Sequence, residues 1–249
     1  MRVETNTVLI KRNRKIAQYL FFGSFAVLIG WLFISSSQMT DPNQPVNFFT
    51  GVVVPAVLLP AAFITSIISV RFTNLWVRQP RPEDVIRANL KGISPKAVLY
   101  DYYFFPARHV LIAPQGVYAM ITRFQDGRYT VKDDVWKTHR SAISRIFSIL
   151  RFDHIGDPTA EAKRAAAYVQ KLIDPIAPNV KVHPLIVFVD PRAVVEVESS
   201  TVPIVYTFMD KSPSLKEFLR EEAQTASKEK RLSLTPEQIA AFEAAALKR

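Results

Sequence analysis

The sequence predicts an α/β protein in two parts, a transmembrane hairpin of two helices followed by a mixed-sheet domain. Residues 16–70 contain one charged side chain, Asp41, whereas residues 71–249 are rich in both basic and acidic side chains. In the second part, apolar runs of strand length alternate with helical patterns, as is typical of helices packed on a mixed sheet. The first observation excludes a uniformly soluble protein.

Two uncharged stretches are long enough to cross a membrane. Residues 16–36 provide 21 uncharged residues and residues 46–70 provide 25. At about 1.5 Å per helical residue, each can cross a hydrocarbon core of roughly 30 Å. Pro55 and Pro60 are expected to kink the second helix without abolishing it. The short polar stretch 37–45 is the predicted external loop.

Basic residues flank both spans on the sides away from the loop. They are Arg2, Lys11, Arg12, Arg14 and Lys15 before the first span, and Arg71, Arg78 and Arg81 after the second. Because cytoplasmic flanks are enriched in Lys and Arg, both termini, including the basic segment 1–15, are expected in the cytoplasm, with the hairpin in the inner (plasma) membrane. A cleaved signal peptide is the alternative, but its apolar region would be shorter. No ionisable residue lies inside either span, so we interpret the hairpin as an anchor.

The composition excludes several chemistries. The chain has no cysteine, which excludes disulfides, thiolate metal sites and cysteine nucleophiles and fits a reducing compartment. Its seven glycines form neither a Walker loop nor a G-x-G-x-x-G motif. Its four histidines show no H-E-x-x-H spacing, and no G-x-S-x-G is present. Common nucleotide, zinc-hydrolase and serine-hydrolase sites therefore have no support.

The second part divides into a linker over residues 71–82, a domain over residues 83–210 and a helical extension over residues 211–249. The expected elements are a short helix within 83–92, strands at 97–105, 108–113, 117–123 and 128–131, a helix at 158–174, strands at 182–189, 193–197 and 202–208, a helix at 214–223, a solvated link at 224–233 and a last helix opened by Thr235-Pro236. The first four strands are expected to form an antiparallel meander, because Asp126-Gly127 is a hairpin turn signal.

One run of these elements carries a set of motifs. A helix is followed by three strands containing R-H-V-L-I-A-P-Q-G-V-Y-A-M-I-T-R-F, a D-G turn, a Trp, a D-P helix opening and the strand V-H-P-L-I-V-F-V. In these features residues 80–210 resemble the nuclease-related domain called NERD. The resemblance implies a restriction-endonuclease-like fold. Active members of that fold hold Mg²⁺ with carboxylates on adjacent strands next to a lysine, and the ion activates water against a phosphate.

The polar positions of the resemblance carry side chains that do not bind metal ions. The first family aspartate corresponds to Arg108, the second acid to Ile121 and the lysine to Arg123. Arg123 keeps the charge of the lysine but not its compact ammonium group. The resemblance therefore implies a catalytically degenerate domain, with no metal and no cofactor, that acts in binding or scaffolding.

A membrane-tethered, Mg²⁺-dependent nuclease with relocated ligands is the alternative. Its candidate acids are Glu83 on the first helix, Asp126 after the third strand, and Glu161, which stands where the family often has glutamine. An acid in the first turn of a helix is also favoured by the helix dipole, which accounts for Glu83 and Glu161 without catalysis.

Two kinds of anionic partner fit the net positive charge, nucleic acid and anionic lipid. Arg108, Arg123 and Arg128 are expected near one strand end, where they would contact nucleic-acid phosphates. Residues 137–152, read as a helix, present basic and apolar side chains suited to a lipid surface, with the candidates Arg140, Arg145, Phe147 and Arg151. A helix packed on the sheet explains the same pattern, and a basic flank follows from membrane topology alone.

Overall fold

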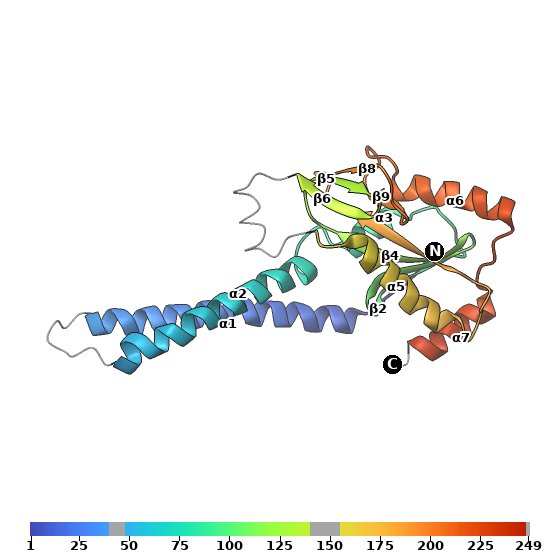
Figure 1. Ribbon diagram of the computed structural model, residues 1–249. Coiled ribbons are helices and arrows are strands. Elements are labelled where there is room, and N and C mark those ends of the chain that lie inside the picture. The colour runs from blue at the N-terminus through green and yellow to red at the C-terminus, as the bar shows by residue number, and fades with distance from the viewer. Residues whose placement is uncertain (40–47, 140–154, 248–249) are drawn as a thin grey trace. The chain divides into compact units, whose positions relative to one another are not determined.

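The computed structural model describes residues 1–39, 48–139 and 155–247 (Figure 1). The chain divides into two compact units, of which one contains Met1–Thr7 together with the described residues from Pro80 onward, and the other contains Val8–Gln79. The predicted α/β class is confirmed, because the chain forms two mixed sheets and two apolar helices long enough to cross a membrane.

The second unit is a pair of long helices. They are α1 (Thr7–Met39) and α2 (Val54–Trp76), and a π-helix, η1 (Phe49–Val53), leads directly into α2. Helix α2 continues through Pro60, as the sequence predicts. It also continues to Trp76, so the first part of the segment expected to be a linker is helical. Helix α1, with 33 residues, is longer than the uncharged stretch from which it was predicted, whereas α2, with 23 residues, begins and ends later than its predicted span.

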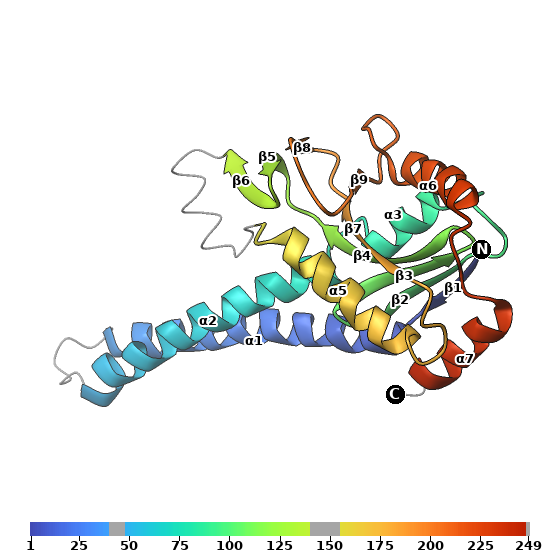
Figure 2. The ribbon, with the colours of Figure 1, turned by 45° about the vertical axis from the view of Figure 1, so that its right-hand side comes forward.

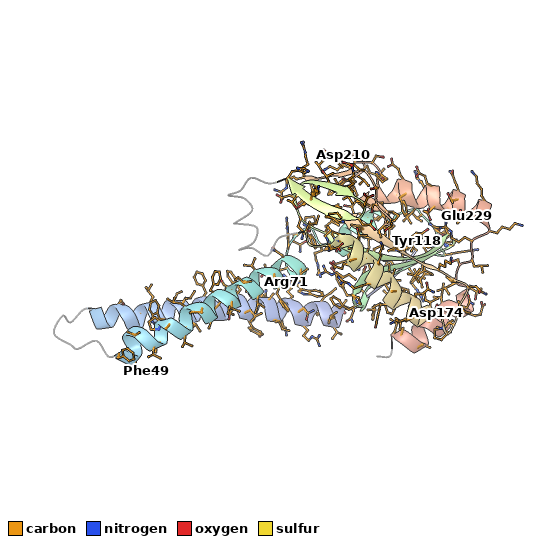
Figure 3. All side chains as sticks on the ribbon, viewed as in Figure 1. Phe49, Arg71, Tyr118, Asp174, Asp210 and Glu229 are labelled. Atoms are coloured by element: carbon orange, nitrogen blue, oxygen red, sulfur yellow. The ribbon has the colours of Figure 1, made fainter. Side chains whose placement is uncertain are left out.

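The two helices lie side by side (Figures 1 and 2), and all the buried positions described on them except Ile10 carry small residues. These positions are seven residues apart on each helix: Ile10, Ala17 and Ser24 on α1, and Ala62 and Ser69 on α2. Small side chains at such a seam let two helix backbones approach closely in a membrane. The large apolar side chains project outward (Figure 3), and Phe22 and Phe33 are 67% and 75% exposed. This outward apolar surface suits a lipid environment.

A six-stranded mixed sheet forms the frame of the first unit, with the strand order β1-β2-β3-β4-β7-β9. The strands are β1 (Arg2–Thr5), β2 (Val98–Phe104), β3 (Ala107–Ala113), β4 (Gly116–Arg123), β7 (Val182–Phe188) and β9 (Ile204–Tyr206). Strands β2, β3 and β4 are antiparallel, whereas β1 pairs with β2, β7 with β4 and β9 with β7 in parallel. The nearly continuous apolar runs of β4 and β7 reflect burial on both faces.

Helices cover both faces of this sheet. Helices α5 (Pro158–Ile173) and α7 (Pro236–Ala246) share one apolar core with Ile121, and α5 lies across that face (Figure 2). Helices α3 (Pro82–Asn89) and α6 (Leu215–Glu229) share a second core with Met120. Successive strand residues point to opposite faces, which is why neighbours in β4 belong to different cores.

A smaller sheet of three strands, β6 (Val135–His139), β5 (Gly127–Lys132) and β8 (Ala193–Val197), extends the first unit. The predicted meander is wrong at its fourth strand. Strand β5 pairs with β6 and β8 instead of β4, because β7 occupies the remaining edge of β4. Lys137 belongs to β6 and not to a helix. Residues 138 and 139 also belong to β6, and the remainder of that predicted lipid-surface helix, with Arg140, Arg145, Phe147 and Arg151, lies outside the described residues.

The N-terminal strand β1 was not predicted. The Arg2 amide donates to the Ala97 carbonyl at 2.9 Å, and the Asn6 amide donates to the Asp101 carbonyl at 3.0 Å. These bonds attach the segment before α1 to a strand that follows α2. The segment expected to be only a basic flank is therefore part of the folded sheet.

The predicted helix openings are confirmed, but α6 is longer than expected. Asp157 caps α5, and Thr235 caps α7 with a capping box. Ser214 opens α6 with a capping box, and α6 continues to Glu229 before Lys230 takes a left-handed conformation. The first residues of the predicted solvated link 224–233 are therefore helical, since the buried Ala226 holds this last part of α6 on the domain.

Candidate functional site

The residues at the family positions lie on the face of the sheet that α5 covers. In β4, Ile121 and Arg123 are two residues apart and so share that face, where Ile121 packs in the same core as Val110 of β3. Arg108, two residues before Val110, points to the same face. Helix α5 adds Glu161. The structure thus brings together three predicted family positions and one predicted alternative acid.

Arg123 and Glu161 form an ion pair. The Arg123 Nη2 atom donates to Glu161 Oε2 at 2.6 Å, and the side chains are 7% and 33% exposed. Arg123 Nη1 also donates to the Thr122 carbonyl at 3.4 Å, whereas Arg123 Nε is buried with no hydrogen-bond partner among the described residues. This guanidinium therefore donates to the Thr122 carbonyl of its own strand and to the Glu161 carboxylate of α5.

The opening of α5 places this carboxylate. The Ala160 amide donates to Asp157 Oδ1 at 2.9 Å, and the Glu161 amide donates to the Asp157 carbonyl at 3.2 Å. Trp136 of the small sheet donates from Nε1 to Thr159 Oγ1 at 2.9 Å. A capping residue, a proline at the first helical position and this tryptophan contact together fix the first turn of α5, on which Glu161 stands.

Three arginines act on Glu161. Burial, the largest single influence, raises the pKa of Glu161, but the hydrogen bond and charge of Arg123 and the charges of Arg108 and Arg164 lower it further than burial raises it. The carboxylate is therefore held ionised, and the charges of three arginines favour that form. We call Arg108, Arg123, Arg164 and Glu161 the arginine site. Its net positive charge favours an anion and opposes a divalent cation.

The other candidate acids lie elsewhere, each beside its own arginine. Glu83 is buried on α3, with Oε1 at 2.6 Å from Arg81 Nη2 and Oε2 accepting from the Tyr102 hydroxyl at 2.9 Å. Asp126 follows β4, and its Oδ2 lies 3.4 Å from Arg192 Nη2. Within the described ranges, no three His, Asp or Glu side chains lie close enough together to hold a metal ion. The structure does not gather the relocated ligands into one cluster.

Arg128 is separated from the other two predicted phosphate-binding arginines. It lies in β5 of the small sheet, its side chain is 65% exposed, and its Nε atom is 3.9 Å from Glu196 Oε1. The predicted trio of Arg108, Arg123 and Arg128 is therefore divided between two sheets, and Arg164 is the arginine that sequence reasoning missed.

A second polar cluster, which the sequence did not predict, lies on the opposite face, beneath α3. Asp101 of β2 is fully buried. Its Oδ1 lies 2.8 Å from His109 Nδ1, and its Oδ2 accepts from Arg87 Nη2 at 2.7 Å and from Thr5 Oγ1 at 3.1 Å. Arg87 also donates to Thr5. We call these four residues the aspartate cluster. It joins α3, β1, β2 and β3.

Asp101 beside His109 resembles the aspartate that orients a catalytic histidine, but a substrate cannot reach either side chain. Burial, the largest influence, raises the pKa of Asp101, while hydrogen bonds and charges from His109 and Arg87 lower it by more. Both Asp101 and His109 are completely buried, so the cluster holds the fold together. An aspartate inside the apolar strand V-L-Y-D-Y-Y-F was the signal for such a cluster, because a buried charge needs partners.

Comparisons with known proteins do not assign the chain. No family model, no curated protein and no solved structure matches it. What the chain does has to be inferred from its own residues, and the arginine site and the apolar hairpin are the two features that bear on function.

Proposed function

We propose that this chain is a membrane-anchored, NERD-like domain that no longer cleaves nucleic acid and binds it at the cytoplasmic face of the inner membrane. The observation that carries the proposal is the ion pair between Arg123 and Glu161 at 2.6 Å. At positions where the family would hold a cation with carboxylates, a guanidinium is itself the cation. A site of this kind attracts the phosphates of a nucleic acid and has nothing to hold Mg²⁺.

The order of the elements supports the NERD-like, restriction-endonuclease-like assignment. Helix α3 is followed by the antiparallel strands β2, β3 and β4, then by α5, and then by β7, which is parallel to β4. This is the order of elements on which the resemblance rests. The arginine site lies where β3, β4 and α5 come together, as the family positions would require.

The N-terminal strand supports a two-span topology. Residues Met1–Thr7 and the chain from Pro80 belong to one compact unit, joined by the hydrogen bonds between β1 and β2. A folded sheet cannot have strands on both sides of a bilayer, so the chain between them must cross an even number of times. The two apolar helices provide two crossings, and the basic flanks favour the cytoplasm for the domain.

Nucleic acid is the partner that the described residues favour over anionic lipid. Arginine presents a planar fork of donors to a phosphate, and the arginine site has a surplus of such groups around Glu161. The residues expected to contact lipid lie outside the described part of the chain, so only their sequence pattern supports a lipid partner. Nucleic acid also matches the ligand of the family that the chain resembles.

Binding and cleavage should be measured together on the full chain in detergent micelles. Fluorescence anisotropy with a labelled single-stranded oligonucleotide is expected to show binding that weakens as salt rises. A gel assay with Mg²⁺ is expected to show no cleavage, with or without EDTA. Arg123→Ala should weaken binding, whereas Arg220→Ala, at an exposed arginine on α6, serves as the matched control.

The relocated-ligand nuclease makes the opposite prediction. Cleavage that EDTA abolishes and that is lost in Glu161→Ala would contradict the proposal and establish a metal-dependent enzyme. Binding to anionic vesicles with no binding to the oligonucleotide would replace nucleic acid with lipid as the partner.

A further inference from the structure

The two members of the Arg123–Glu161 pair differ in their freedom to move. Arg123 is 7% exposed and also donates to the Thr122 carbonyl of its own strand, so its guanidinium has little room. One third of the Glu161 side chain is exposed, at 33%, on the first turn of a surface helix. A rotation of the Glu161 side chain would bring its carboxylate into water without moving the sheet.

The net charge around Arg123 becomes more positive when the Glu161 side chain rotates away from it. With Glu161 in place, one carboxylate partly neutralises Arg123, Arg108 and Arg164. Without it, Arg123 Nη2 loses its 2.6 Å acceptor, and the positive charges of Arg108 and Arg164 no longer act on a carboxylate at this position. A buried guanidinium left without an acceptor is costly, so the departure requires another anion to take the place of Glu161.

A phosphodiester has the chemistry to make this exchange. Like a carboxylate, it offers two charged or partly charged oxygens to the fork of an arginine, and it can be approached by more than one arginine at once. Of the three predicted alternative acids, Glu161 is the one with an observed ion pair to Arg123 of the site. This acid therefore competes directly with the ligand of the proposed function.

We propose that Glu161 is a built-in competitor for phosphate, which occupies Arg123 in the unliganded protein and must leave when a nucleic-acid phosphodiester binds. The inference rests on the proposed function and adds its regulation. Nucleic acid then binds more weakly than the three arginines alone would permit, and the Glu161 carboxylate sets that affinity.

The test compares two charge-neutralising substitutions in the full chain in detergent micelles. Glu161→Gln removes the competing charge and keeps the shape of the side chain. Glu237→Gln is the matched control, because Glu237 also stands in the first turn of a helix and makes no ion pair among the described residues. Anisotropy with the labelled oligonucleotide should show a gain of about tenfold in affinity for Glu161→Gln. Glu237→Gln should change the affinity by less than about twofold.

A double variant and a phosphate-binding measurement test whether the gain comes from Arg123. The double variant Arg123→Ala with Glu161→Gln should lose the gain, since the gain depends on a freed guanidinium. Inorganic phosphate should raise the thermal unfolding midpoint of Glu161→Gln more than that of the wild-type chain. If Glu161→Gln does not fold, Glu161→Asp, which retracts the carboxylate by one methylene, should still bind the oligonucleotide more tightly than the wild type.

The outcomes separate this inference from the proposed function. An equal effect of Glu161→Gln and Glu237→Gln, with binding intact and no cleavage, overturns the competitor role alone. Absence of oligonucleotide binding in every variant overturns both proposals, as does metal-dependent cleavage that Glu161→Gln abolishes. In nanodiscs, a gain that is present in phosphatidylcholine and vanishes when phosphatidylglycerol is added overturns the assignment of the site to nucleic acid in favour of a lipid headgroup.

Discussion

The arginine site and the aspartate cluster lie on opposite faces of one sheet, and they differ in how completely their charges are satisfied. Asp101 is fully buried, and three side chains from three other elements donate to it or pair with it. Glu161 is one third exposed, and among the residues that the structure describes its side-chain hydrogen-bond donor is Arg123. The first carboxylate is surrounded, whereas the second lies at the edge of an excess of positive charge.

The difference indicates what each cluster is for. A closed buried network fixes the elements that contribute to it, because removing one member leaves its partners buried and unsatisfied. A pair whose carboxylate is one third exposed contributes less to stability than a closed network, and it can exchange its anion for another. Stability should therefore depend on Asp101 and ligand binding on Glu161.

The largest expected effect is that of Asp101→Asn. The substitution leaves the fully buried His109 and the partly exposed Arg87 beside a neutral amide, and it should lower the free energy of unfolding by about 3 kcal/mol. Denaturant unfolding of the full chain in detergent, followed by circular dichroism, measures the loss. Oligonucleotide binding by the folded fraction should be unchanged. A loss below about 1 kcal/mol would show that the aspartate cluster is not the closed network described above.

The second expected effect concerns β1, which carries Thr5 of the aspartate cluster. A fragment of residues 80–249 lacks this strand, its ladder with β2 and the apolar packing of Val3. Fusing residues 1–6 to that fragment through a flexible linker should raise its free energy of unfolding by about 2 kcal/mol, the sum of a few hydrogen bonds and one partly buried side chain. Equal stability of the two fragments would contradict the assignment of β1 to the folded unit.

The third effect is a dependence of stability on pH. Because the folded state lowers the pKa of Asp101 from its ordinary value of 3.8, the stabilisation is complete above that value and is lost as the pH falls through the lower folded pKa. The free energy of unfolding should decline below about pH 4, and Asp101→Asn should flatten that decline. Glu161 has the same sign, since its pKa is also lowered. An unchanged slope in Asp101→Asn would assign the acid sensitivity to other carboxylates.

The sequence predicted those parts of the fold that depend on neighbouring residues. Asp157-Pro158 and Thr235-Pro236 specify their helices locally, and the apolar runs of β4 and β7 require burial on both faces. Which strands pair is decided at longer range. Strand β5 leaves the meander because β7 takes the edge of β4, and the four residues Arg2–Thr5 carry no pattern long enough to indicate an edge strand.

In the two clusters, too, the sequence indicated single residues but not the contacts between distant elements. Family resemblance placed Arg108, Ile121 and Arg123 on adjacent strands, and a helix opening drew attention to Glu161. The sequence could not show that Glu161 pairs with Arg123 or that Arg164 joins them, because these contacts depend on how α5 lies on the sheet. The pairing of Asp101 with His109 likewise needs the register of β2 against β3, which a bulge between Asp101 and Phe104 ends.

The smallest expected change in stability is that of Glu161→Gln, and it makes the sharpest comparison with Asp101→Asn. Both substitutions replace a carboxylate with an amide beside an arginine, but only Asp101 is closed off from water. Glu161→Gln should lower the free energy of unfolding by less than about 1 kcal/mol, since solvent screens the partly exposed carboxylate and the amide oxygen still accepts from Arg123. Denaturant unfolding under the conditions used for Asp101→Asn measures the difference. A loss as large as that of Asp101→Asn would mean that Glu161 is as firmly fixed as Asp101, and a carboxylate held that firmly could not give way to a phosphate.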